Sequence, residues 1–396
     1  MSAELEASAP KGDQVFGVGR CWQVLCVVGA RPNFMKIAPL MRAFAGSSTL
    51  TASLVHTGQH YDQAMKAAFF DQLLIPEPDV DLGVGSGSHA VQTAEIMKRF
   101  EPVLDARCPD AVLVVGDVNS TIACALVAAK KSVPVVHVEA GLRSFDREMP
   151  EEINRILTDQ LSALLYTTEP EAMRNLSSEG VDAKRVRLVG NVMIDTLLAN
   201  RPRAPRPDLV FQRAGIVEAN RPASGFGLVT LHRPSNVDDA ATLTRLLDTL
   251  ATLSRDLPLV FPLHPRTRAR LEQGGLLARA AETMLLMPPL DYLDMLGLLA
   301  CARIVLTDSG GIQEETTALG VPCLTLRENT ERPITVEQGT NTIVGSNPDR
   351  ILGAALDVLS GGGKGGRIPE LWDGRAAERI VADLDAWFAD RCPVDR

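Results

Sequence analysis

The chain of 396 residues has few aromatic side chains, no excess of positive charge and no long apolar run. Aromatic residues make up 4% of it, which argues against base-stacking platforms for single-stranded nucleic acid. The formal net charge is −9, so we expect no non-specific binding to nucleic acid or to an anionic membrane surface. Because no run of about 18 apolar residues occurs, the sequence predicts no membrane span. An anionic ligand would have to be held by a local pocket.

Closely spaced cysteine pairs are missing as well. The seven cysteines are scattered without a CxxC pair, and several lie in apolar runs, as buried free thiols usually do. We therefore expect no disulfide framework, no metal site and a reducing, cytoplasmic location. Residues 1–20 contain two cationic residues but no apolar stretch, so we expect a flexible N-terminal tail and not a secretory signal.

What the chain does contain is a repeated alternation of apolar, strand-like runs and helix-like segments. With 45% hydrophobic residues and this length, two α/β domains are the natural expectation. Continuous apolar strands separated by helices predict parallel sheets that are covered on both faces. The expected strands are residues 24–28, 54–56, 111–115 and 134–138 in the first half, and 228–231, 259–263, 304–306 and 322–326 in the second.

An Arg/Pro-rich stretch, residues 201–207, separates the two halves and is typical of an interdomain linker or its edge. We expect an α/β fold of two Rossmann-like, doubly wound domains that face each other across a cleft. The N-terminal domain should comprise residues 21–195 plus 376–396, because the amphipathic stretch 376–388 can pack back on it. The C-terminal, nucleotide-binding domain should comprise residues 196–375.

A phosphate-binding turn is predicted where the strand 304–306 ends. Ser309, Gly310 and Gly311 break the strand, and residues 312–319 have a helical pattern. A turn without β-carbons that opens into a helix directs free N–H groups and the positive dipole end at one point, which suits a phosphate. Glu315 lies in the first turns, where its carboxylate could accept hydrogen bonds from ribose hydroxyls. Taken alone, the segment is equally compatible with an ordinary Gly-rich strand-to-helix connection.

Acidic side chains also follow predicted strands. Asp117 and Glu139 come after two successive strands, and Glu151 begins a helix expected to run on to Leu165. In open parallel sheets, ligands bind outside the carboxyl ends of the strands. Each carboxylate alone could be a helix cap or a dipole partner. Together they indicate acid–base machinery beside the nucleotide.

Cationic residues occur near the same strand ends. Arg155 follows Glu151 by four residues, and this pair could equally be a solvent-exposed helix pair. His232 ends a strand of the second half and is a candidate partner for phosphate or for a carboxylate, although a histidine there is more often structural. The remaining cationic candidates are Arg31, Lys36, Arg143 and Arg233.

Eight segments, in this order, resemble the non-hydrolysing UDP-N-acetylglucosamine 2-epimerases: residues 29–40, 57–60, 116–117, 137–143, 150–155, 231–233, 308–315 and 330–333. The resemblance covers about residues 24 to 345. It implies a glycosyltransferase-B-like fold, a homodimer, and interconversion of UDP-GlcNAc and UDP-ManNAc without a cofactor, for cell-surface polysaccharide or related sugar-nucleotide biosynthesis.

Simple chemistry agrees with a route that avoids oxidation. C2 of the sugar carries an amide and not an oxidisable hydroxyl, and no GxGxxG follows the first strand, so a tightly held nicotinamide is not indicated. UDP would instead leave with loss of the C2 proton, giving 2-acetamidoglucal, and would add back after reprotonation of the opposite face.

The family motifs assign roles to individual residues. The implied catalytic residues are Asp117, Glu139, Glu151 and His232. The implied substrate-binding residues are Arg31, Lys36, Gln59, His60, Arg143, Arg155, Arg233, Ser309, Gly310, Gly311 and Glu315.

Two segments depart from common family versions. Residues 234–236 are Pro-Ser-Asn, where many bacterial members have Arg-Glu-Asn near the site at which a second UDP-GlcNAc activates the enzyme. The loss of that guanidinium predicts weakened or absent substrate activation. Residues 33–35 are Asn-Phe-Met, bulkier than usual, which suggests a modified sugar such as a UDP-linked deoxy or diacetamido sugar.

Three other functions stay open from the sequence. A glycosyltransferase of the same fold would need the nucleotide site and an acceptor, but has no evident use for the three carboxylates together. A hydrolysing epimerase would release free ManNAc and UDP. A non-catalytic sugar-nucleotide sensor would leave the C2 proton in place.

Overall fold

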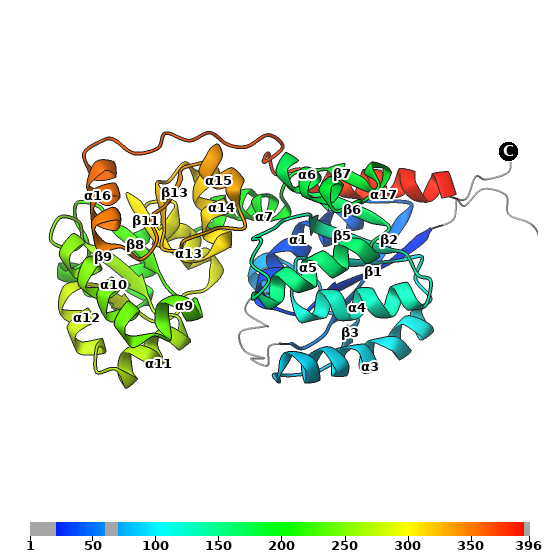
Figure 1. Cartoon of the computed structure of the whole chain (residues 1–396), viewed down its shortest axis with the longest axis horizontal. Coiled ribbons are helices and arrows are strands. Elements are labelled where there is room, and N and C mark those ends of the chain that lie inside the picture. Colours follow the sequence, from blue (N-terminus) through cyan, green and yellow to red (C-terminus); the bar gives the residue numbers. More distant parts are fainter. Residues whose placement is uncertain (1–20, 60–69, 392–396) are drawn as a thin grey trace, which may run out of the picture.

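The computed structural model describes residues 21–59 and 70–391, with two sheets that lie in separate halves of the molecule (Figure 1). The strand orders are β3-β2-β1-β4-β5-β6-β7 and β10-β9-β8-β11-β12-β13. The paired strands run parallel in both sheets. Each order reverses direction beside its first strand, which is the doubly wound pattern. The predicted α/β fold of two Rossmann-like domains is confirmed.

The first half is built on buried, β-branched strands whose side chains alternate between two helical layers. Val24, Cys26 and Val28 pack against α1, α7 and α17, whereas Leu25 and Val27 pack against α3 and α4. Its elements are β1 (Trp22–Val28), α1 (Arg31–Ala45), β2 (Leu50–His56), β3 (Val80–Asp81), α3 (His89–Arg107), β4 (Ala111–Val115), α4 (Asn119–Lys130), β5 (Val135–Ala140), α5 (Pro150–Leu161), β6 (Leu164–Thr167), α6 (Pro170–Ser178), η1 (Ala183–Arg185), β7 (Val186–Leu188), α7 (Val192–Asn200) and η2 (Arg201–Arg203).

The second half repeats this construction around its own core. Leu-rich α10 covers one face of its sheet, and its buried leucines pack on strand residues such as Val229 and Phe261. Its elements are α8 (Pro207–Arg213), η3 (Glu218–Asn220), β8 (Gly227–Thr230), α9 (Pro234–Val237), α10 (Ala240–Leu253), β9 (Leu259–Pro262), α11 (Pro265–Gln273), α12 (Leu277–Thr283), β10 (Leu285–Met287), α13 (Tyr292–Leu299), β11 (Ile304–Thr307), α14 (Gly310–Leu319), β12 (Cys323–Thr325), α15 (Pro333–Glu337), β13 (Asn341–Ile343) and α16 (Pro348–Leu359).

The last helix, α17 (Ala376–Arg391), lies against the first half (Figure 1). Phe388 stacks on Trp22 of β1 with ring centroids 4.9 Å apart. The carboxylate of Asp195 accepts hydrogen bonds from the first two backbone N–H groups of α17. The predicted domain boundary at residues 195/196 falls inside α7, between the last strand of one sheet and the first strand of the other.

One predicted helix is too long. The helix that begins at Pro150 ends at Leu161 and does not run on to Leu165. Ser162 takes an extended conformation, and residues 164–167 form the fully buried strand β6 between β5 and β7. The side chains of residues 164–167 are buried in a strand that pairs with neighbours on both sides. This tertiary environment outweighs the helical propensity of the segment.

The described residues contain no helix that is long and apolar enough to cross a membrane. Within the same residues, no group of three or more His, Cys, Asp or Glu side chains could hold a metal ion. The predicted tail at residues 1–20 lies outside the described part of the chain.

Candidate active site

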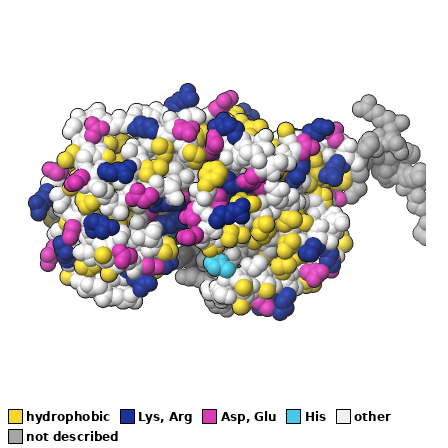
Figure 2. All heavy atoms as spheres, viewed as in Figure 1, with side chains coloured by type: hydrophobic (Ala, Val, Ile, Leu, Met, Phe, Trp, Pro, Cys, Tyr) yellow, Lys and Arg dark blue, Asp and Glu magenta, His cyan; other side chains and the backbone are white. Residues whose placement is uncertain are grey.

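Glu139 lies at the centre of a charged cluster between the two halves. Its side chain is buried, and one carboxylate oxygen lies 2.8 Å from Nζ of Lys36 in α1. The other oxygen accepts a hydrogen bond of 2.7 Å from Nη2 of Arg332, which belongs to the second half. Figure 2 shows acidic and basic side chains together where the halves meet. A carboxylate of one sheet is thus held by cations from both domains.

The backbone at Glu139 is strained in a way that directs this side chain. Its φ is 71°, and the register between β5 and β6 shifts between Val138 and Ala140. A non-glycine residue in this region costs roughly 1–3 kcal/mol and persists only where the surroundings fix it. The shift turns Glu139 out of the regular alternation of β5 toward Lys36 and Arg332.

Asp117 follows β4 directly and joins the same cluster. Its carboxylate accepts a 2.5 Å hydrogen bond from Nη2 of Arg155. Burial raises the pKa of Asp117, but the charges of Arg155, Lys36 and Arg332 outweigh it and lower the pKa to about 2. Asp117 is therefore ionised at neutral pH, so it can accept a proton but has none to give.

Gly116, next to Asp117, makes room for the lysine. Its φ is 65°, and a β-carbon built on it would lie 2.6 Å from Nζ of Lys36. Only glycine allows both this left-handed turn and the close approach of the ammonium group.

Arg155 is buried and bonded to Asp117 and, at 2.8 Å, to Glu152. The alternative of an exposed helix pair with Glu151 is therefore wrong. Glu152 is itself held by the hydroxyl and N–H of Ser144 and by the N–H of Phe145. This carboxylate anchors the loop between β5 and α5.

Glu151 is half-buried at the start of α5 and has no hydrogen bond or ion pair to the described residues. It precedes Arg155 by one helical turn, so both side chains lie on the same side of α5. Its acid–base role stays a prediction.

Arg143 does not fit its predicted role as a substrate ligand. Its guanidinium is buried against Glu179, with hydrogen bonds of 2.6 and 2.7 Å, and against Asp159 at 2.7 Å. A further hydrogen bond goes to the carbonyl of Leu142. Arg143 thus fixes the loop after β5, and its donors are directed at protein groups.

The turn predicted to bind phosphate connects a strand to a helix in the second half, as its sequence indicated. β11 ends at Thr307, Ser309 is the residue before the first helical turn, and α14 begins at Gly310. A β-carbon at Gly310 would lie 2.6 Å from a carboxylate oxygen of Glu331, and one at Gly311 would lie 3.2 Å from the side chain of Met193. The first N–H groups of α14 have no partner within the helix, an arrangement that suits an anion; the phosphate contact stays a prediction.

Glu315 lies one turn into α14 and is buried. The hydroxyl of Tyr292 faces its carboxylate, and burial together with that negative charge raises the pKa of Tyr292. Glu315 is thus held on the helix that carries the predicted phosphate turn, as its predicted ribose contact requires.

His232 is oriented by a buried aspartate. Its Nδ1 lies 2.8 Å from Asp308, whose carboxylate also accepts hydrogen bonds from the N–H groups of His232 and Arg233 and from the amide of Asn236. Burial alone would raise the pKa of Asp308, but the hydrogen bond and charge of His232 and these N–H groups lower it. With Nδ1 facing Asp308 and the side chain 37% exposed, Nε2 is the ring nitrogen left for a ligand.

Arg233 points its guanidinium at Glu331, at 3.3 Å, and Arg327 lies 2.8 Å from the same carboxylate. Burial raises the pKa of Glu331, but Arg327, Arg332 and Arg233 lower it to about 2. A substrate contact of Arg233 stays a prediction.

The first-half loop residues are only partly described. The side chain of Gln59 accepts hydrogen bonds from the N–H and hydroxyl of Ser120, which ties the loop after β2 to α4. His60 and the side chain of Arg31 lie outside the described part of the structure. Their predicted contacts stay predictions.

Three residues of the cluster were given no role from the sequence. Arg332 bridges Glu139 and, through Nε at 2.9 Å, Glu314 of α14. Asn191 of the first half donates a 2.9 Å hydrogen bond to the same oxygen of Glu314. Residues 330–333 belong to the family motifs, which was the available signal for Arg332. Its partner Glu139 is 193 residues away, so spacing could not reveal the contact.

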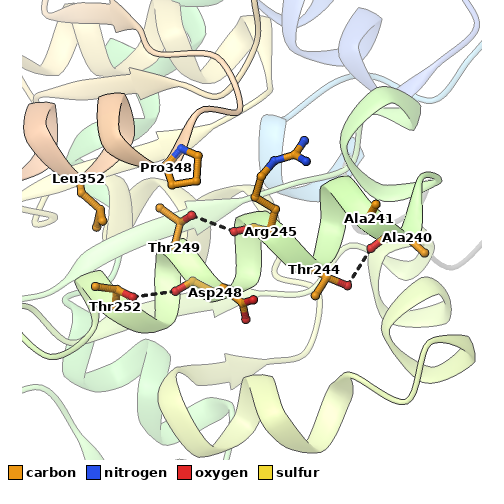
Figure 3. A pocket seen from close by; sticks show the side chains of 9 residues that line it. All are labelled: Ala240, Ala241, Thr244, Arg245, Asp248, Thr249, Thr252, Pro348 and Leu352. Atoms are coloured by element: carbon orange, nitrogen blue, oxygen red, sulfur yellow. Dashed lines mark hydrogen bonds between the residues drawn. The ribbon is translucent and has the colours of Figure 1, made fainter.

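A shallow groove of about 600 Å³ between α10 and α16 is a poorer candidate (Figure 3). Its threonine hydroxyls donate back to carbonyls of their own helix, Thr244 to Ala240, Thr249 to Arg245 and Thr252 to Asp248. These donors are already used, so the groove offers little to orient a polar ligand.

Two facing Rossmann-like domains, one with a phosphate turn and one with carboxylates at the opposing sheet edge, define a glycosyltransferase-B-like enzyme. Comparison with known proteins gives the family: the chain belongs to the UDP-N-acetylglucosamine 2-epimerases, whose family model matches residues 42–385. This is a family of isomerases.

Individual relatives agree with this assignment. A UDP-N-acetylglucosamine 2-epimerase of Methanococcus maripaludis is 39% identical over 342 residues, covering 85% of this chain and 92% of the relative. A UDP-2,3-diacetamido-2,3-dideoxy-D-glucuronate 2-epimerase of Pseudomonas aeruginosa is 42% identical over 340 residues, with coverage of 85% and 92%. The crystal structure of Methanocaldococcus jannaschii UDP-GlcNAc 2-epimerase with UDP-GlcNAc and UDP is 38% identical, with a TM-score of 0.83 and coverage of 92% and 99%.

Proposed function

We propose that this protein interconverts UDP-GlcNAc and UDP-ManNAc by eliminating UDP and adding it back. The observation that supports this most is the cluster of Asp117 and Glu139, held by cations from both domains opposite the start of α14. A diphosphate at α14 would place the sugar between these two groups.

The leaving group is stabilised mainly by the second domain in this proposal. The hydroxyl of Ser309 and the N–H groups of Gly310 and Gly311 donate to the phosphates, since the N–H of Ser309 already donates to Thr307. His232 donates from Nε2 as an imidazolium, and Glu315 accepts from the ribose. As the C1–O bond breaks, negative charge grows on the diphosphate, and preorganised donors stabilise it without rearrangement.

Proton transfer at C2 falls to the first domain. Elimination takes the C2 proton onto one carboxylate, and reprotonation from another group on the opposite face inverts the centre before UDP returns. Because its pKa is about 2, Asp117 begins the cycle as an acceptor. Glu139 and Glu151 complete the proposed set.

A single incubation separates this proposal from its alternatives. UDP-GlcNAc is given alone, without any acceptor sugar or lipid, and products are identified by proton NMR. The expected result is UDP-ManNAc with the sugar still attached to the nucleotide. Free ManNAc with UDP would indicate a hydrolysing enzyme, and an unchanged substrate would indicate a transferase or a sensor.

A diacetamido sugar nucleotide is the second candidate substrate, supported by the 42% identical relative. Residues 33–35 no longer support it. Asn33 is buried and bonded to Ala30 and Val115, and Phe34 packs in the core with Phe70 at 5.0 Å. The bulk of this segment fills the first domain. Comparing kcat/KM for UDP-GlcNAc and for a UDP-diacetamido sugar distinguishes the two candidates.

Weak or absent activation by a second UDP-GlcNAc is also proposed. The residues at 234–236 form the short helix α9, where Asn236 bonds to Asp308 and to the carbonyl of Leu326. Pro234 offers no donor to a second diphosphate. Initial rates should follow a hyperbola in UDP-GlcNAc concentration, and a sigmoidal curve would contradict this.

We further propose a cytoplasmic homodimer. Ile153 and Leu157 are 45% and 49% exposed on one face of α5, four residues apart, and Phe145 nearby is 77% exposed. Such an apolar face is suited to a partner copy. Light scattering after gel filtration should give twice the chain mass of 42.6 kDa, and a monomer mass would exclude the dimer.

A further inference from the structure

His137 lies in β5, two residues before Glu139, with no exposed surface. Its Nδ1 is 2.7 Å from a carboxylate oxygen of Asp159, and its Nε2 is 2.8 Å from the carbonyl oxygen of Gly116. Both ring nitrogens therefore face hydrogen-bond acceptors.

The partners fix the protonation state of this ring. A carbonyl oxygen can only accept, so Nε2 carries a hydrogen. The second oxygen of Asp159 already receives Nη2 of Arg143 at 2.7 Å and the N–H of Gly141 at 3.1 Å. The ion pair with Arg143 favours the ionised form of Asp159, and beside an ionised carboxylate Nδ1 donates as well. A ring that donates from both nitrogens is an imidazolium.

Charge balance agrees with this state. Asp159 faces two cations, His137 and Arg143, and Arg143 is also paired with Glu179. The charges of His137 and Arg143 balance those of Asp159 and Glu179 only when His137 is charged. A neutral His137 would leave these four side chains one positive charge short, at a site where Asp159 and His137 are fully buried.

His137 and Asp159 hydrogen-bond to the two segments that carry the proposed acid–base residues, at the ends of β4 and β5. His137 holds the peptide carbonyl that immediately precedes Asp117, and Asp159 holds the N–H two residues after Glu139. The N–H of Gly116 in turn donates to the carbonyl of Val138. Asp117 and Glu139 are therefore fixed relative to each other by one buried ring.

We propose that His137 is a permanently charged positioning residue that sets the separation of Asp117 and Glu139. The role assigned to these two carboxylates rests on the proposed epimerase function, whereas the charge of the ring does not. His137 itself does not touch the substrate in this proposal.

Two variants each keep one of the two hydrogen bonds of the His137 ring and remove the other. In His137→Gln, the amide nitrogen can reach toward the Gly116 carbonyl, in place of Nε2. In His137→Asn, it can reach only toward Asp159, in place of Nδ1. Misplacing reacting groups by about 1 Å can lower a rate by on the order of 10²-fold. We expect a loss of that size in kcat for the Asn variant, partial recovery for the Gln variant, and little change in KM for either.

The matched control is His89→Gln, an exposed histidine of α3 that bonds to Asn119. It should leave kcat unchanged. UDP affinity, measured by calorimetry, should be the same in all variants because the nucleotide site lies in the other domain. Equal kcat in the Asn variant and the wild type would overturn the positioning role.

The charge is measured on the wild type, and the variants serve only to assign the signals of His137. Nitrogen-15 NMR of histidine-labelled protein at pH 7.5 should show hydrogens on both ring nitrogens of His137, identified by loss of its signals in His137→Gln or His137→Asn. A signal from an unprotonated ring nitrogen would overturn the proposal. This readout needs no substrate, so it can succeed even if the proposed epimerase activity is absent.

Discussion

Glu139 combines a left-handed backbone, full burial of its carboxylate and two ionic partners from different domains. Few residues with a structural role alone require all three. Lys36 and Arg332 hold the carboxylate from two sides, and this fixes its position. The strain at this position is therefore consistent with an acid–base residue that must be aimed accurately.

Replacing Glu139 by glutamine should lower kcat by about 10²–10⁴-fold, because the amide cannot carry a proton to or from C2. The affinity for UDP should change little, since the proposed nucleotide site lies in the other domain. Rates of UDP-ManNAc formation and calorimetric UDP titrations measure the two effects. Glu148→Gln, an exposed change in the same loop, is the control, and wild-type turnover in Glu139→Gln would refute the assigned role.

A fourth carboxyl at the same sheet edge escaped prediction. Glu169 follows β6, is buried, and neither of its oxygens hydrogen-bonds to a described residue. Burial raises its pKa from 4.5 to about 8, since Arg332 opposes this only in part and Glu314 adds to it. The helix predicted from Pro150 to Leu165 overlapped the start of β6, and no strand was predicted there, which hid the place of Glu169 at the site.

This raised pKa makes stability depend on pH. Between the ordinary glutamate value of 4.5 and about 8, the unfolded chain has lost the proton that folded Glu169 keeps. Stability therefore falls as pH rises through this window and is flat above it. Between pH 5.5 and 8.5, Glu169→Gln should remove about 3 kcal/mol of that fall. Urea unfolding at pH 5.5 and 8.5 measures it. Glu77→Gln, an exposed change, is the control, and an unchanged slope in Glu169→Gln would contradict the account.

At the residue scale, the sequence indicated which side chains matter better than what they contact. Arg155 and Lys36 were predicted to bind substrate and contact the predicted carboxylates Asp117 and Glu139. Arg143 was predicted with them, but it is turned toward Glu179 and Asp159. Arg143 and Arg155 are both arginines near a strand end. They differ because the loop after β5 directs Arg143 away from the cluster, and the spacing of residues along the chain does not reveal the direction of a loop.

At the scale of elements, long apolar runs were predictable because their side chains are buried on both faces of a sheet. The strand at residues 111–115 has the predicted bounds. β6 was missed because only Ser162 and Ala163 separate it from α5, without glycine or proline. The edge strands β3 and β10 have two and three residues, too few to show a pattern.

The start of α14 gives a test at this scale. Gly310→Ala would press a β-carbon against Glu331, 2.6 Å away, and displace the first turn or that carboxylate. We expect UDP affinity to fall by about 10-fold or more, equivalent to about 1.4 kcal/mol.

Gly353→Ala in α16 is the matched control for this change. A β-carbon there meets no atom within 4 Å, so UDP binding should not change and the helix should gain about 0.5–1 kcal/mol. Calorimetry and thermal melts measure both variants. Unchanged UDP affinity in Gly310→Ala would exclude this turn as the phosphate site.

For the whole molecule, the two-domain architecture followed from the repeated alternation of strands and helices. The contacts between the two domains could not be predicted from that alternation. Arg332 meets Glu139 across 193 residues, and Asn191 meets Glu314 across 123. Such pairs depend on how two finished domains dock, which no local pattern encodes.

Arg332 should therefore control the closure of the cleft. Arg332→Ala removes the cation shared by Glu139 and Glu314 and leaves two buried carboxylates facing each other. We expect a larger radius of gyration by small-angle X-ray scattering and a loss in kcat of on the order of 10²-fold. Arg350→Ala, an exposed change in α16, should alter neither, and a closed, fully active Arg332→Ala would contradict this role.

The central claim is that buried carboxylates exchange the proton at C2 of a UDP-sugar. Proton NMR of the wild-type protein with UDP-GlcNAc in heavy water, without any acceptor, tests this most directly. Deuterium should enter C2 of both UDP-GlcNAc and UDP-ManNAc, and Glu139→Gln should suppress its entry. Formation of UDP-ManNAc that retains the original C2 proton, or no exchange at all, would contradict the account.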